Sequence, residues 1–132
     1  MYKSKIYLNK QIEPYIALGV LLLCTVFSFG QNPPQASDDN YTTDINATLD
    51  VSAPGILAND TFDDQTTATV VSFTINGTAY NAGDTANITE GDMTLLADGS
   101  FIFIPTADFT GDLPPINYNI SNGINTSTAV VN

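Results

Sequence analysis

The side chains in this sequence that could do chemistry are mainly carboxylates and amides, and several of them stand close together along the chain. Calcium is a hard cation that takes about six to eight oxygen ligands, which Asp, Asn and backbone carbonyls supply. The spacing of an EF-hand loop does not occur, so the ligands would have to converge from separate loops. We predict a calcium site whose candidate ligands are Asp38, Asp39, Asn59, Asp60, Asp63 and Asp64.

Positive charge is confined to the first ten residues, where Lys3, Lys5 and Lys10 are the only basic side chains. Residues 31–132 therefore contain no basic side chain that could bind nucleic-acid phosphates. The chain contains no His and only one cysteine, Cys24. Histidine bases, His-containing triads, lysine Schiff bases and zinc sites of His and Cys are excluded for the same region.

The clustered acidic residues have other interpretations besides calcium. All fourteen Asp and Glu residues except Glu13 lie beyond residue 30. Their repulsion destabilises a compact state, and either a bound divalent ion or a saline medium would relieve it. Asp and Asn are also common in turns, where acidic loops are simply solvated. The sequence leaves these alternatives open.

Paired carboxylates could also act in glycoside hydrolysis. That chemistry needs a cleft and an acid kept protonated by apolar surroundings. A small domain with no Trp and with its acids in turns offers neither feature, so we predict that the protein is not an enzyme.

Residues 1–30 are predicted to be a signal peptide. The lysines form a positive start, an apolar run follows at 15–27, and Ser28 and Gly30 supply small residues before a cleavage site at Gln31. The alternative is an uncleaved N-terminal anchor. We expect a secreted or cell-surface protein with no membrane span after cleavage, in which residues 31–35 form a Pro-rich linker.

The remaining residues, 36–132, have the pattern of short strands separated by turns. Asn76-Gly77 is a strong type I′ hairpin signal, and Asp98-Gly99 and Asn122-Gly123 indicate two more turns. We predict about seven antiparallel strands, at 45–51, 70–75, 78–80, 93–96, 100–104, 116–120 and 126–131, which is typical of an all-β sandwich. The predicted core is Ile45, Leu49, Val71, Phe73, Ile75, Leu95, Phe101, Phe103, Tyr118 and Val130.

Four blocks of this region resemble the cadherin-like, Ig-like tandem repeats of bacterial secreted and surface proteins. The first block is Ala-Ser-Asp-Asp-Asn-Tyr at 36–41, and the second is Leu-Asp-Val at 49–51 followed by Gly-Ile-Leu-Ala-Asn-Asp-Thr at 55–61. The third is Asp-Gly-Ser-Phe-Ile-Phe-Ile-Pro at 98–105 with Asp-Phe-Thr-Gly at 108–111, and the fourth is Tyr-Asn-Ile-Ser-Asn-Gly at 118–123. Phe62 and Asn122 stand where the family often has Asp, which weakens a calcium site carried over from it.

The resemblance implies an Ig-like β-sandwich that works as a non-catalytic structural or adhesion module, with calcium between neighbouring repeats. We expect this chain to be one repeat of a larger surface protein, and a monomer. Its expected partners are neighbouring repeats, other surface proteins or glycans. The alternative function is a glycan-binding module that uses exposed aromatic side chains, for which Tyr41, Phe62, Tyr80 and Phe109 are the candidates.

Overall fold

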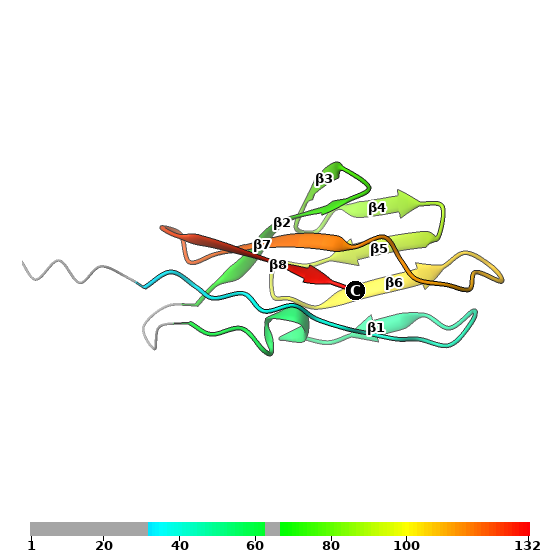
Figure 1. The fold of residues 1–132 in the computed structure, drawn as a ribbon, viewed down its shortest axis with the longest axis horizontal. Helices are drawn as coiled ribbons and strands as arrows, with labels where there is room; N and C mark the ends of the chain where they lie inside the picture. Colours follow the sequence, from blue (N-terminus) through cyan, green and yellow to red (C-terminus); the bar gives the residue numbers. More distant parts are fainter. Residues whose placement is uncertain (1–31, 63–66) are drawn as a thin grey trace, which may run out of the picture. The chain divides into compact units, whose positions relative to one another are not determined.

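The structure, a computed structural model, describes residues 32–62 and 67–132, so the predicted signal peptide, Asp63 and Asp64 lie outside the described residues. The described residues form two packed antiparallel sheets and one short 3-10 helix (Figure 1). This confirms the predicted Ig-like β-sandwich. The elements are β1 (Leu49–Val51), η1 (Gly55–Leu57), β2 (Thr69–Ile75), β3 (Thr78–Asn81), β4 (Thr85–Ile88), β5 (Gly91–Leu95), β6 (Phe101–Pro105), β7 (Ile116–Ser121) and β8 (Thr126–Val131).

One sheet has the strand order β1-β6-β5-β4, and the other has the order β3-β2-β7-β8. The hairpin predicted at Asn76-Gly77 joins β2 to β3, and both turn residues have positive φ, 51° and 77°, as a type I′ turn requires. Strand β4 was not predicted, because only Ala86 and Ile88 alternate in it. Among the described residues, no helix has the length and apolar character needed to cross a membrane.

The core lies between the two sheets and contains most of the side chains expected there, including Phe73 and Tyr118, which are fully buried. Val71 was predicted to be buried but is 43% exposed. The β2–β7 register shifts between Val70 and Ser72, so Val71 is the extra residue of a bulge and points outward. Val70 takes its place in the core.

Two further core predictions were wrong. Ile45 is 54% exposed, because Asn46 has a left-handed backbone (φ 60°) and the strand begins only at Leu49. In β8 the pairing of Val131 with Ile116 and of Ala129 with Tyr118 turns these two residues inward. Val130 has the opposite parity and is only half-buried.

The helix η1 packs directly against the turn between β5 and β6, and glycine makes this contact possible. The Ile56 amide donates to the Gly99 carbonyl over 3.0 Å. A Cβ on Gly55 would lie 2.0 Å from that carbonyl oxygen, and a Cβ on Gly99 would lie 2.1 Å from the Pro54 oxygen. This backbone contact fixes where the following residues, 58–61, leave the helix.

Residues 35–41, here called the N-terminal segment, run alongside the end of β8, as the cyan trace in Figure 1 shows. Gln35 exchanges two backbone hydrogen bonds with Thr61, and Asp39 forms a parallel bridge with Val131. Pro34 is fully buried, so the packed module already includes the end of the predicted linker. The N-terminal segment thereby covers part of the β8 edge.

Candidate functional site

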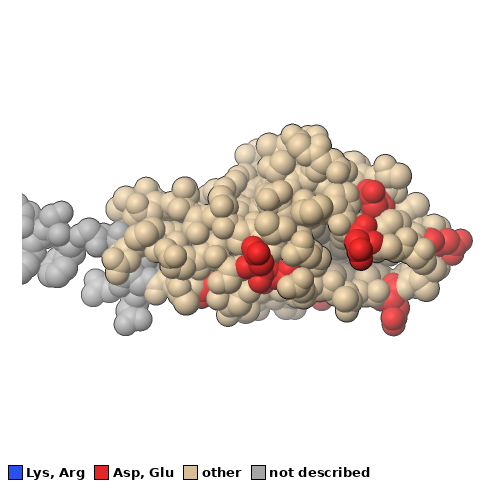
Figure 2. All heavy atoms as spheres, viewed as in Figure 1, with Lys and Arg blue, Asp and Glu red and all other residues tan. Residues whose placement is uncertain are grey.

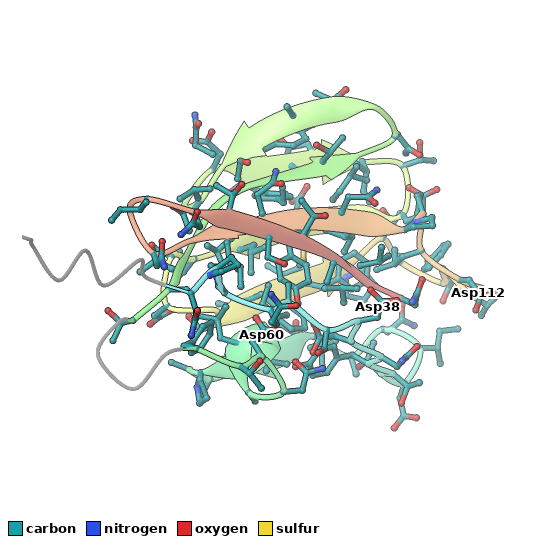
Figure 3. The ribbon with its side chains drawn as sticks, turned by 60° about the vertical axis from the view of Figure 1, so that its left-hand side comes forward. Asp38, Asp60 and Asp112 are labelled. Carbon is teal, nitrogen blue, oxygen red and sulfur yellow. The ribbon has the colours of Figure 1, made fainter. Side chains whose placement is uncertain are left out.

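The structure brings together four of the six residues predicted as calcium ligands. Asp38 and Asp39 lie on the N-terminal segment, and Asn59 and Asp60 lie on the loop after η1; Figure 3 labels Asp38 and Asp60. The Asn59 amide donates to the Asp38 carbonyl (3.0 Å), and the Ser37 N–H donates to Asp60 Oδ1 (2.8 Å). These bonds join segments about 20 residues apart.

Tyr118 on β7 completes the arrangement from inside the sandwich. Its hydroxyl oxygen lies 2.9 Å from Asp39 Oδ2 and 3.0 Å from the Ser37 carbonyl oxygen, and it donates a shared hydrogen bond to them. On the other side, the Val130 N–H donates to Asp38 Oδ1 over 2.9 Å. We call Asp38, Asp39 and Asp60 the aspartate cluster.

Burial and mutual repulsion change the acidity of this cluster. Asp39 is 7% exposed, and desolvation, followed by the charges of Asp60 and Asp38, raises its pKa to about 6 against the effect of the Tyr118 hydrogen bond. Burial also raises the pKa of Asp60, which the Ser37 hydrogen bond partly offsets. The pKa of Tyr118 is raised by burial and by Asp39. Since residues 32–62 and 67–132 contain no basic side chain, the hydrogen bonds that these carboxylates make there come from N–H and O–H donors.

Each of the three carboxylates accepts at least one hydrogen bond from the protein, so the cluster joins parts of the structure. The second carboxylate oxygen of Asp60, Oδ2, is buried and has no hydrogen-bond partner. The donor atoms are all oxygen, which suits calcium in kind. However, within residues 32–62 and 67–132 no group of three or more acidic, His or Cys side chains has the arrangement of a metal site.

The aromatic residues considered for glycan binding occupy different surroundings. Tyr80 stacks on Phe73 with ring centroids 5.3 Å apart, and Tyr41 meets Phe101 edge-on at 4.9 Å. Phe62 is also partly buried against the core. Three of the four candidates therefore pack inward and form no flat exposed platform.

Sequence reasoning placed Tyr118 in the core but missed its polar role. The available signal was its position in the Tyr-Asn-Ile-Ser-Asn-Gly block at 118–123, since a fully buried Tyr usually finds a partner for its hydroxyl. The partner could not be named from the sequence, because Ser37 and Asp39 are about 80 residues away.

Comparison with known proteins agrees with this geometry. A family model described as bacterial Ig domain matches residues 31–132, which is most of the chain. The search of curated proteins found no match. The predicted resemblance to a bacterial Ig-like domain is thus confirmed, and domains of this family are structural modules that typically occur in surface or extracellular proteins. The chain belongs to the bacterial Ig domain family.

Proposed function

We propose that the protein is a non-catalytic extracellular module that carries mechanical load and supports adhesion, as one repeat of a larger surface protein. The observation that carries the proposal is the pairing of the N-terminal segment with the end of β8. The Asp39 N–H donates to the Val130 carbonyl (2.8 Å), and the Asn132 N–H donates to the Asp39 carbonyl (3.0 Å). The two ends of the module are thus joined side by side in parallel.

This parallel pairing has a mechanical consequence. When the N-terminal segment and β8 are pulled in opposite directions, their hydrogen bonds are loaded together rather than one after another. The Asp38 carboxylate adds a further bond to the Val130 N–H, and Tyr118 holds the Ser37 carbonyl from below. Net hydrogen-bond energies of about 1 kcal/mol each then act as one cooperative unit.

The test is single-molecule unfolding of the full chain, pulled through residues 32 and 132. The Asp38→Ala variant loses the acceptor for the Val130 N–H, so we expect its unfolding force to fall. Asp84→Ala is the matched control, because Asp84 is also exposed and accepts a backbone hydrogen bond, from Asn81. Equal forces for the wild type and Asp38→Ala would overturn the proposed load-bearing role.

Calcium is part of the proposal as a ligand of the aspartate cluster. The support is the unpartnered oxygen of Asp60 and the raised pKa of Asp39, which burial causes first and the charges of Asp60 and Asp38 add to. Because the described residues do not fill a calcium coordination sphere, we expect weak binding, with a dissociation constant of about 1 mM, like that of extracellular modules. Such a site would stabilise the module by about 1.4 kcal/mol at 10 mM calcium.

Thermal unfolding at fixed ionic strength tests the calcium proposal. We expect 10 mM calcium to raise the melting temperature above that in EDTA by about 4–8 °C. Asp60→Asn should remove the increase, whereas Asp92→Asn, an exposed residue of β5 outside the aspartate cluster, should keep it. An equal increase with sodium chloride alone would show that screening of charge, and not calcium, is responsible.

A further inference from the structure

A groove of about 660 Å³ opens between the residues that precede β1 and the connection from β6 to β7. Its floor consists of core side chains, among them Met93, Phe101 and Phe103, which are all at most 3% exposed. Tyr41 and Leu113, both half-buried, contribute to its walls. The groove therefore borders the apolar layer between the sheets, and no motif in the sequence indicated it.

Two hydrogen bonds join the segment before β1 to the β6–β7 connection, next to the residues that line the groove. The Asn46 amide donates to Asp108 Oδ1 (3.1 Å), and the Asp108 N–H donates to Asn46 Oδ1 (2.7 Å). Both residues have a left-handed backbone, with φ of 60° and 62°. This reciprocal pair turns the chain away from the sandwich before β1 and leaves Ile45, which also lines the groove, 54% exposed. The two segments that flank the groove are thus joined to each other beside it.

The polar part of the lining is acidic. Asp44 and Asp112 line the groove and are both exposed; we call them the rim aspartates. Figure 2 shows acidic atoms near the middle of the module and at its right-hand end, with no basic ones among the described residues on the face in view, and Figure 3 labels Asp112 on the β6–β7 connection. Because the chain has no Lys, Arg or His after Lys10, residues 31–132 cannot supply a cation to this rim.

We propose that this groove binds a segment of another protein in which a large apolar side chain is flanked by Lys or Arg. The apolar side chain enters the space above Phe101 and Phe103, while the cations face the rim aspartates and the ring of Tyr41. A second copy of residues 31–132 fits poorly, since it would bring only further negative charge. This inference specifies the partner chemistry for the adhesion part of the proposed function and rests on that part alone.

The probe is a fluorescent peptide of about twelve residues that alternates Phe and Leu with Lys, compared with the same peptide carrying Glu for Lys. Fluorescence anisotropy with the full chain should show saturable binding of the Lys peptide, at least about tenfold tighter than the Glu peptide. Raising the salt concentration should weaken this binding, because the rim is exposed.

Two double variants with the same net charge test whether binding depends on the rim aspartates or only on the negative charge of the whole module. Asp44→Asn with Asp112→Asn should weaken binding about tenfold. Asp50→Asn with Asp92→Asn, which alters exposed residues on the outer face of the β1-β6-β5-β4 sheet, should leave it unchanged. Ile45→Ser tests the apolar part without disturbing the core, and should also weaken binding.

Equal effects of the two double variants, or binding that Ile45→Ser leaves unchanged, would overturn the proposal. If a neutral polysaccharide bound the protein, and this binding was lost in Tyr41→Ala but unchanged in Asp44→Asn with Asp112→Asn, the groove would be a glycan site instead. Neither result would alter the loss of unfolding force expected for Asp38→Ala, so the groove and the load-bearing role can fail separately.

Discussion

The aspartate cluster and the groove rim use the same residue type in opposite ways. In the cluster, Asp39 is buried and bonded to Tyr118, and Asp38 and Asp60 accept hydrogen bonds from backbone N–H groups. At the rim, Asp44 and Asp112 are exposed beside an apolar groove. Neither region contains a basic residue. The two regions therefore differ in the hydrogen-bond donors that surround each carboxylate.

This contrast shows why acidity alone says little about function. A carboxylate surrounded by N–H and O–H donors joins distant segments and contributes to stability. An exposed carboxylate at the mouth of a groove contributes little to stability and is available to a partner. If the aspartate cluster stabilises the fold and the rim does not, substitutions that disturb the cluster should lower the free energy of unfolding more than substitutions at the rim.

The largest effect is expected at Gly55, which positions the helix η1 and the loop that carries Asp60. In Gly55→Ala the new Cβ would lie 2.0 Å from the Gly99 oxygen, and the residue would keep an unfavourable φ of 53°. We expect the free energy of unfolding to fall by about 3 kcal/mol, from backbone strain and overpacking together. Urea denaturation followed by circular dichroism measures this loss.

Gly77→Ala is the matched control, since Gly77 also has positive φ (77°) but a Cβ added there would have no atom within 4 Å. Its cost should be about 1 kcal/mol, from the left-handed backbone alone. If both variants lost the same stability, the contact between η1 and the β5–β6 turn would not be what holds the cluster loop in place.

Most of the fold could be predicted because its strongest signals are local. Asn76-Gly77 specifies its hairpin within four residues, and the alternation of Phe101 and Phe103 gives the inward face of β6 directly. The errors arose where the pairing between strands, and not the local sequence, determines which side chains face the core. The bulge at Val71 and the parity of Val130 depend on the pairing with β7, and β1 begins only after Asn46, whose backbone is left-handed.

The candidate site was predictable only in part for the same reason. Turn-forming Asp and Asn residues identified the segments of the cluster, but not which donors each carboxylate meets. The bonds of Asp39 to Tyr118 and of Asp38 to Val130 join residues that lie 79 and 92 positions apart. Nothing in the sequence indicated the groove, because its floor consists of side chains that also belong to the core.

An intermediate effect is expected when the cluster loses its internal donor. Tyr118→Phe keeps the buried ring but leaves the Asp39 carboxylate and the Ser37 carbonyl without the hydroxyl. We expect a loss of about 2 kcal/mol in the free energy of unfolding, the cost of leaving buried acceptors unpaired. Tyr80→Phe, on a half-buried ring stacked on Phe73, should cost less than about 0.5 kcal/mol. Equal losses would remove the polar role assigned to Tyr118.

The smallest effect is the dependence of stability on pH. The pKa of Asp39 is raised from 3.8 to about 6, so the folded state binds this proton more tightly than the unfolded chain does. The resulting stabilisation is complete below the unfolded pKa and is lost as the pH rises through about 6. Acidification from pH 7.5 to pH 5 should therefore raise the free energy of unfolding by about 1 kcal/mol. The raised pKa of Asp60 acts in the same direction.

The contribution of Asp39 is isolated by comparing variants, because other groups titrate too. The pKa of Asp98 is lowered by its hydrogen bonds to Ser100, which gives the opposite sign on acidification. Asp39→Asn keeps an oxygen for the Tyr118 hydroxyl but cannot titrate, so the gain between pH 7.5 and pH 5 should shrink in this variant. Asp112→Asn at the rim leaves the buried pair intact and should keep the gain. If the rim variant abolished the gain as fully as Asp39→Asn, the pH response would come from the net charge of the module, and the two acidic regions would be electrostatically alike.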